Sequence, residues 1–166
     1  MVSPDIKPST PYPDVADPTS TAEIGRETPR IALGITHRRN RELLEELLST
    51  FDVTEVADPI PDRTDLCIVD ATGLSEFRES ITTWKQNERP ATAPVLLLTT
   101  DSADDAWRRY GDSVGDLLDA IHPIPSPKEA IRSRVDGLLS TRHHSLVSRQ
   151  RQQDLELYKR ASDGAQ

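Results

Sequence analysis

The chain places one carboxylate, that of Asp70, directly after the short apolar run Leu66-Cys67-Ile68-Val69. A run of this kind is typical of a parallel strand that is buried on both faces. Open α/β sheets hold their ligands and reacting groups at the carboxyl ends of such strands. A carboxylate at that place can bind a hard cation or react with a substrate group, so Asp70 is the first candidate functional residue.

Other kinds of site have no matching motif in the sequence. There is no Gly-x-Gly-x-x-Gly, no Walker phosphate loop and no Gly-x-Ser-x-Gly nucleophile elbow. The single cysteine, Cys67, excludes an internal disulfide and is interpreted as a small core residue. The four histidines form neither a catalytic triad motif nor a Cys/His zinc pattern: His37, His122, His143 and His144.

Strand and helix patterns alternate around Asp70. Apolar runs predict five strands, over residues 30–36, 51–57, 66–70, 94–100 and 117–121. Pro59 and Pro61 follow the second strand, so the helix after it is expected to be short or missing. Helical spacing elsewhere predicts four helices. The first covers residues 41–48 behind Asn40, and the second stops near Asn87 and has an apolar face of Leu74, Phe77, Ile81 and Trp84. The third is capped by Asp101 or Ser102 and turns Ala103, Ala106, Trp107 and Tyr110 to the sheet, and the fourth begins after Pro127 with an inner face of Ile131, Val135, Leu138 and Leu139.

This alternation predicts a single α/β domain: a flavodoxin-like, doubly wound, five-stranded parallel sheet with helices on both faces. In the strand order 2-1-3-4-5, the first and third strands are neighbours at the switch point. Thr36 and Asp70, at the ends of these two strands, should therefore lie side by side.

Composition narrows the function classes. The 166 residues carry a net charge of −8, which argues against direct nucleic-acid binding, and no stretch is apolar enough to cross a membrane. Residues 1–29 hold six of the 13 prolines and predict a disordered tail without a secretion signal, so we expect a cytoplasmic protein. The domain is expected over residues 30–140, with a C-terminal signalling or linker helix over 141–166. The Asp-rich, Lys-poor surface suggests a salt-rich host.

Several residues in order resemble the receiver (response-regulator) family of two-component signalling over about residues 30–140. Asp70 matches the phosphoacceptor aspartate, and Thr99 matches the switch Ser/Thr that ends the fourth strand. Gly115 matches the glycine before the fifth strand, and Pro123 matches the proline of a Lys-Pro pair. Asn40-Arg41-Glu42-Leu43-Leu44 is similar to the opening of the family's first helix. The resemblance implies phosphorylation of Asp70 by a histidine kinase, with Mg²⁺ bound beside it.

The departures from the family bear on this mechanism. Ile35 and Thr36 stand where the family has two adjacent carboxylates for Mg²⁺, so a magnesium site at Asp70 should be weak or absent. Asp58 and Asp101, at the ends of neighbouring strands, are candidate substitutes. His122 stands at the family's lysine position, where a nearby Asp70 is expected to raise its pKa. Asp119 replaces the aromatic switch residue of the fifth strand.

Two hypotheses follow. In the first, which we prefer, the domain is a pseudo-receiver that relays a signal or dimerises through its C-terminal helix. No cofactor is assigned to it, and Mg²⁺ is doubtful. In the second, it is a functional receiver that is phosphorylated on Asp70. Neither makes the domain an enzyme in its own right, apart from phosphorylation and dephosphorylation of Asp70.

The C-terminal segment suggests the partners. Helical spacing continues weakly through Leu146 and Leu157, with Arg142, Arg149 and Gln153 between them, which predicts a long polar helix that either frays or pairs two chains. Residues 155–161 are similar to the lead-in helix before PAS sensor domains in regulators and sensor kinases of salt-loving archaea, among them relatives of the bacterio-opsin activator. The resemblance implies a downstream PAS, kinase or other output domain in a longer protein, which would then be a sensor histidine kinase or a transcription regulator.

Overall fold

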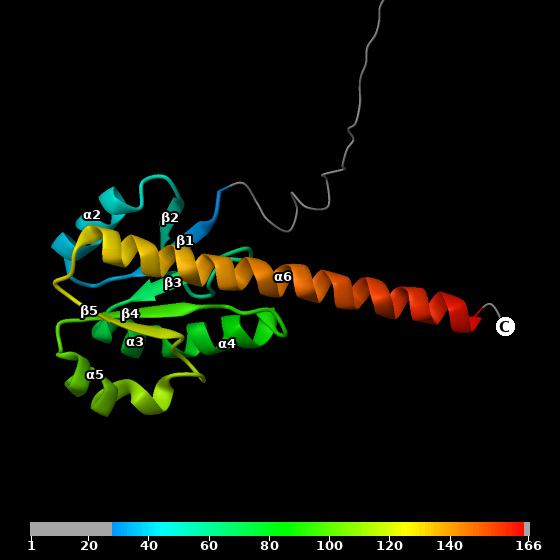
Figure 1. Ribbon diagram of the computed structural model, residues 1–166. Coiled ribbons are helices and arrows are strands. Elements are labelled where there is room, and N and C mark those ends of the chain that lie inside the picture. The colour runs from blue at the N-terminus through cyan, green and yellow to red at the C-terminus, as the bar shows by residue number, and fades with distance from the viewer. Residues whose placement is uncertain (1–27, 165–166) are drawn as a thin grey trace, which may run out of the picture.

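The computed structural model describes residues 28–164, which form a five-stranded parallel sheet with helices on both faces (Figure 1). The strand order is β2-β1-β3-β4-β5, as predicted, and every neighbouring pair is parallel. The strands are β1 (Arg30–Gly34), β2 (Asp52–Glu55), β3 (Leu66–Val69), β4 (Val95–Thr99) and β5 (Ala120–Pro123). The predicted N-terminal tail lies outside the described residues except for its last two positions.

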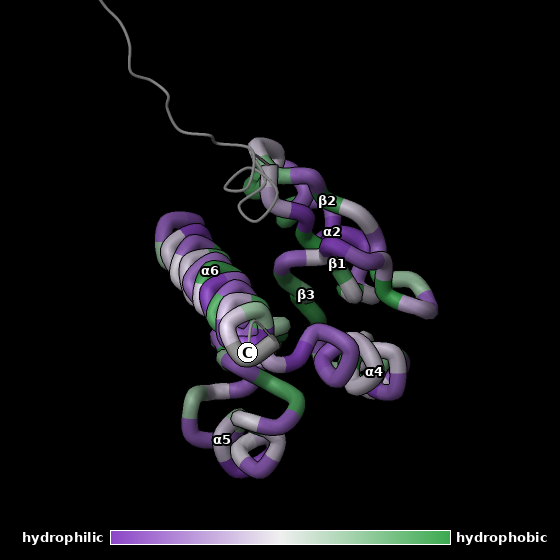
Figure 2. Tube along the Cα trace, turned by 90° about the vertical axis from the view of Figure 1, so that its right-hand side faces the viewer, coloured by the Kyte–Doolittle hydropathy of each residue, from purple (hydrophilic) through white to green (hydrophobic). Residues whose placement is uncertain are grey.

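The helices form one layer on each face of the sheet. They are α2 (Arg38–Leu47), α3 (Ala71–Glu76), α4 (Arg78–Glu88), α5 (Ala103–Tyr110) and α6 (Lys128–Gly164), with a short 3-10 helix, η2, over Gly111–Ser113. One half of the core joins α2 and α6 to the sheet through Leu44, Leu48 and Val135, while the other joins α3 and α4 through Leu74, Ile81 and Trp84. Figure 2 shows the apolar strand β3 between α6 on one side and α4 on the other.

The core residues follow from the sequence pattern. Strands β3 and β4 are buried at every position, because helices cover both of their faces. Cys67 is buried in β3, and its burial raises the pKa of its thiol to about 12, which leaves it unreactive at neutral pH. Residues 56–65, between β2 and β3, contain no helix, as the two prolines predict. Gly115 has a φ of 99°, a conformation that favours glycine, in the turn before β5.

Four local predictions need correction. Helix α2 begins at Arg38 rather than at residue 41, and its cap is His37, whose ring nitrogen accepts from the backbone N–H of Asn40, a residue inside the helix. The single helix expected over residues 74–87 is broken at Phe77 into α3 and α4. Strand β5 begins at Ala120, because the segment before it forms a tight turn that bonds back to Ser113 O. Trp107 is 59% exposed, and α5 buries Ala106 instead.

Helix α6 is one continuous element of 37 residues, about 55 Å long at the usual rise of an α-helix. Its first turns pack on the sheet through Ile131 and Val135, as predicted, and its last turns extend beyond the domain (Figure 1). The helix does not break at residue 140, where the sequence suggests a boundary between domain and linker.

Candidate functional site

Asp70 lies at the carboxyl edge of the sheet, and hydrogen bonds from this chain occupy both of its carboxylate oxygens. Oδ2 accepts from the Thr36 backbone N–H at 2.7 Å, from the Thr36 hydroxyl at 2.9 Å and from the His37 backbone N–H at 3.4 Å. Oδ1 accepts from the Gly73 backbone N–H at 2.7 Å and so caps the first turn of α3. The predicted neighbourhood of Thr36 and Asp70 is therefore confirmed, and the carboxylate joins the ends of β1 and β3 to α3.

Gly73 shows how closely these segments approach one another. A Cβ added at this position would lie 1.8 Å from the backbone oxygen of Gly34, at the end of β1. Only a residue without a side chain lets the start of α3 pack against β1 at this distance. The close approach in turn brings the Gly73 N–H within reach of the Asp70 carboxylate.

Thr99 and His122 are not joined to Asp70 by any hydrogen bond among the described residues. The Thr99 hydroxyl accepts from the Asp101 backbone N–H at 3.1 Å, which fixes the turn after β4. The His122 side chain lines a pocket with residues of α6, and its Nε2 is 2.9 Å from Ser126 Oγ. The expectation that Asp70 raises the pKa of His122 is wrong: burial, assisted by Arg134, lowers it.

In the part of the chain that the structure describes, the candidate ligands beside Asp70 have other partners or no charge. Ile35 is buried, and the Thr36 hydroxyl donates to Asp70 rather than pointing a lone pair at a shared cation. Asp58 accepts from the Ser80 hydroxyl at 2.7 Å, and Asp101 lies 3.3 Å from Arg109, so each carboxylate has a partner elsewhere. Within residues 28–164, no group of three or more His, Cys, Asp and Glu side chains is placed to hold a metal ion.

The amino edge of the sheet carries a buried ionic cluster that sequence reasoning did not identify. Arg142, on α6, is 3% exposed. Its guanidinium bonds to Asp65 Oδ1 at 3.0 Å, to Glu88 Oε1 at 2.8 Å and to the carbonyl of Thr92 at 2.9 Å. These partners precede β3, end α4 and precede β4, so one side chain ties α6 to three segments of the domain.

Two further polar side chains of α6 lie on the same face of the helix as Arg142. Ser145 Oγ accepts from the Thr92 backbone N–H at 2.8 Å, and Arg149 donates to the carbonyl of Glu88 at 3.1 Å. The spacing 142, 145 and 149 places all three on one helical stripe. Sequence analysis placed Arg142 and Arg149 on a polar helix that either frays or pairs two chains, whereas they bind this chain's own domain.

A second ion pair strengthens the same edge. Lys85 Nζ lies 2.7 Å from Asp119 Oδ2, and that oxygen also accepts from the Val95 backbone N–H at 2.8 Å. Asp119 thus precedes β5 at the amino edge and holds β4 and α4 together. It does not occupy the outer face of β5, where the comparison with an aromatic switch residue would place it.

Comparison of the chain with protein-family models, with curated proteins and with solved structures finds no match. Among the described residues, no helix combines the length and the apolar character needed to cross a membrane.

Proposed function

We propose that this chain is a receiver-like signalling module that accepts no phosphoryl group and acts by holding α6 in a fixed position. One observation carries the proposal: the Asp70 carboxylate takes four hydrogen bonds from donors of its own chain. The residues at the position of the expected acidic pair, Ile35 and Thr36, supply no negative charge.

The hydrogen bonds of Asp70 oppose the chemistry of a phosphoacceptor. Phosphoryl transfer would place a bulky dianion on one carboxylate oxygen and remove the charge that the bonded N–H groups stabilise. On Oδ2 it would compete with three donors that tie β1 to β3, and on Oδ1 it would uncap α3. A metal ion that neutralises the incoming charge needs several oxygen ligands, whereas the Asp58 carboxylate is hydrogen-bonded to Ser80 and the Asp101 carboxylate is ion-paired with Arg109.

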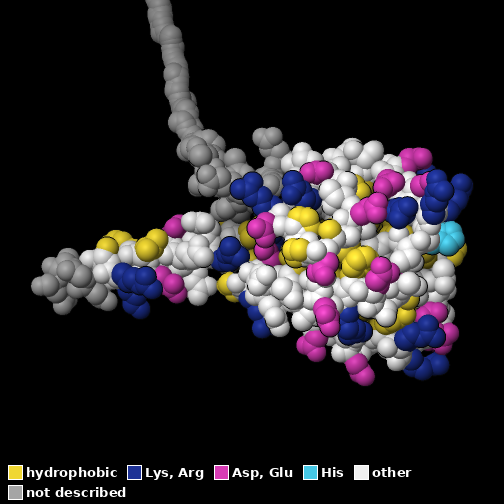
Figure 3. Space-filling model, turned by 180° about the vertical axis from the view of Figure 1, so that it is seen from behind, with side chains coloured by type: hydrophobic (Ala, Val, Ile, Leu, Met, Phe, Trp, Pro, Cys, Tyr) yellow, Lys and Arg dark blue, Asp and Glu magenta, His cyan; other side chains and the backbone are white. Residues whose placement is uncertain are grey.

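Helix α6 is the element through which such a module would act. Its inner turns are fixed to the domain by Arg142 and Arg149, and every described side chain from Gln150 to Ser162 is exposed. Leu155 and Tyr158, one turn apart, are 67% and 74% exposed, and Figure 3 shows apolar side chains on this projecting part of the molecule. We propose this surface as the contact for a downstream module or for α6 of a second copy. Sedimentation equilibrium of the full chain distinguishes the two, because a dimer supports the second copy and a monomer supports the downstream module.

Phosphorylation is tested by incubating the full chain with acetyl phosphate and millimolar Mg²⁺ and measuring its intact mass. The expected result is no phosphorylated species, while a phosphorylatable receiver domain in the same tube gains one phosphoryl group. A gain of one phosphoryl group that is lost in Asp70→Asn would overturn the proposal and establish the alternative, a functional phosphoacceptor at Asp70.

A further inference from the structure

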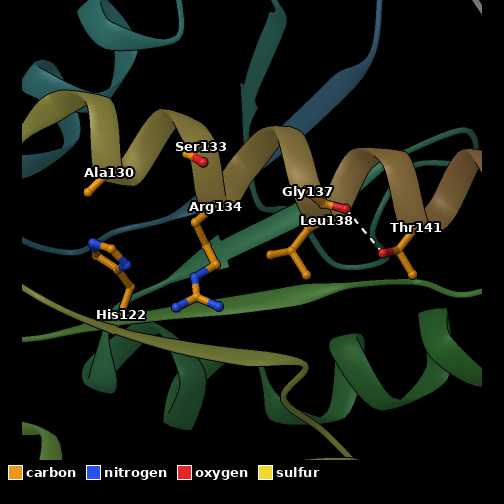
Figure 4. A pocket seen from close by; sticks show the side chains of 7 residues that line it. All are labelled: His122, Ala130, Ser133, Arg134, Gly137, Leu138 and Thr141. Atoms are coloured by element: carbon orange, nitrogen blue, oxygen red, sulfur yellow. Dashed lines mark hydrogen bonds between the residues drawn. The ribbon is translucent and has the colours of Figure 1, made fainter.

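A pocket of about 460 Å³ lies between β5 and α6, away from Asp70. Figure 4 shows its lining, with His122 on the strand side and Arg134 reaching into the same space from the helix. The other lining residues come from α6 and are small, apolar or hydroxylic: Ala130, Ser133, Gly137, Leu138 and Thr141. A volume of this size is within the range of sites for small organic molecules.

One wall of the pocket holds a buried polar atom without a partner. His122 is 8% exposed, and its Nδ1 makes no hydrogen bond within the described part of the chain, whereas Nε2 is 2.9 Å from Ser126 Oγ. Buried polar atoms normally have a partner, since leaving one unpaired costs about 1–3 kcal/mol. In the tautomer whose Nε2 accepts from the Ser126 hydroxyl, the ring proton is on Nδ1, and His122 then presents a donor to the pocket.

The charge of the pocket indicates which acceptor fits. Arg134 is exposed and makes no ion pair or hydrogen bond with any residue from 28 to 164, so its guanidinium is available to a ligand. None of the seven lining residues is acidic, although the whole chain has 28 Asp and Glu. A cation would meet Arg134 without compensation, whereas a carboxylate can take two parallel hydrogen bonds from the guanidinium.

The walls favour an anion that carries an apolar body. A Cβ added at Gly137 would meet nothing within 4 Å, so the pocket is open above the helix backbone at this position. Leu138 and Ala130 supply carbon surface on either side of the opening. An inorganic ion would leave most of this space and surface without contact.

We propose that the pocket between β5 and α6 binds a small organic carboxylate, held by the Arg134 guanidinium and the His122 Nδ1–H, with its apolar part against Leu138 and Gly137. The site is separate from Asp70, and the proposal holds whether or not Asp70 accepts a phosphoryl group. A bound ligand would contact the first turns of α6, which pack on the sheet, and the last turns of the same helix project from the domain.

The proposal is tested on the full chain by calorimetry and by NMR titration with hexanoate, acetate, inorganic phosphate, hexylamine and a short peptide that contains one Glu. We expect saturable binding of hexanoate, weaker binding of acetate, and shifts centred on the resonances of His122 and Arg134. Arg134→Gln should weaken hexanoate binding at least about tenfold, because it removes the charged donor of a bidentate pair. Arg151→Gln, an exposed arginine on the projecting part of α6, is the matched control and should bind like the unmodified chain.

Arg134 is exposed, so Arg134→Gln should keep the melting temperature of the unmodified chain and report on binding alone. Four results would overturn the proposal. The first two are that hexanoate shows no saturable binding and that its binding is unchanged in Arg134→Gln. The third is that phosphate or hexylamine binds at least as tightly as hexanoate. The fourth is that the Glu peptide binds more tightly than hexanoate, which would assign the pocket to a protein partner.

Discussion

The two edges of the sheet differ in the kind of polar contact they hold. At the carboxyl edge, Asp70 is bonded by four uncharged donors from segments within 34 positions of it in the sequence. At the amino edge, Arg142 forms buried ion pairs with Asp65 and Glu88 and belongs to α6, the last helix in the order of the sequence. The edge expected to do chemistry is used for local structure, while the opposite edge fixes the helix that leaves the domain.

The largest effect is expected at the amino edge. Arg142→Ala leaves Asp65, Glu88 and the Thr92 carbonyl without their cationic donor, and removing one partner of a buried ion pair typically costs about 3–5 kcal/mol. Urea unfolding should show a loss of this order. Arg151→Ala, on the exposed part of α6, is the control and should change stability by less than about 0.5 kcal/mol. Equal effects of the two substitutions would remove the contrast between the edges.

The carboxyl edge should be sensitive to added volume at Gly73. Gly73→Ala drives a methyl group into the Gly34 carbonyl and should cost about 1–3 kcal/mol or more, as overpacking does. Gly137→Ala is the matched substitution in α6, where the space is open, and should stabilise the helix by about 0.5–1 kcal/mol. Thermal unfolding of the two variants should therefore shift in opposite directions; a shift in the same direction would contradict the packing described at Gly73.

The variant Asp70→Asn tests two roles of Asp70 separately: the cap of α3 and the link between β1 and β3. Asparagine is a good N-cap and can still accept from the Gly73 N–H, but it cannot also present a full acceptor to all three donors on Oδ2. We expect a loss of about 1–2 kcal/mol in urea unfolding. A gain in stability would instead indicate that the Asp70 charge is held under strain, as in a site kept for reaction.

The smallest effect concerns pH and lies away from both edges. The fold lowers the pKa of His122 below its usual 6.5, so the neutral ring is the form that the folded state favours. Its contribution to stability is complete above pH 6.5 and is lost as the pH falls through the lowered pKa. The unmodified chain should therefore lose more stability than His122→Gln between pH 7 and pH 5, whereas parallel pH profiles would contradict this assignment.

The sheet order could be predicted because local patterns determine it. The apolar runs that form β1, β3 and β4 are short and separated by helical stretches, which leaves few parallel topologies. The cap of α5 was narrowed to Asp101 or Ser102 for the same local reason, and the structure assigns it to Ser102, whose hydroxyl accepts from the N–H of Asp105. The break between α3 and α4 at Phe77 could not be predicted, because the periodicity of apolar residues continues across it.

The ionic cluster could not be predicted because its members are far apart in the sequence. Arg142 and Asp65 are 77 positions apart, and an arginine on a polar helix gives no sign that it is buried. Sequence analysis ended the fifth strand at residue 121, whereas β5 runs to Pro123 and holds His122 within the strand, in a pocket shared with α6.

The central claim, that the Asp70 carboxylate is a structural acceptor, is tested most directly by amide hydrogen exchange. The Thr36 and Gly73 N–H groups donate to this carboxylate, and their exchange can be followed by NMR with and without Mg²⁺ and beryllofluoride. The account predicts that both amides are protected and that neither their exchange rates nor their chemical shifts change when the phosphoryl mimic is added. Loss of protection or saturable shifts at these two amides would show that Asp70 is free to bind the mimic and would contradict the claim.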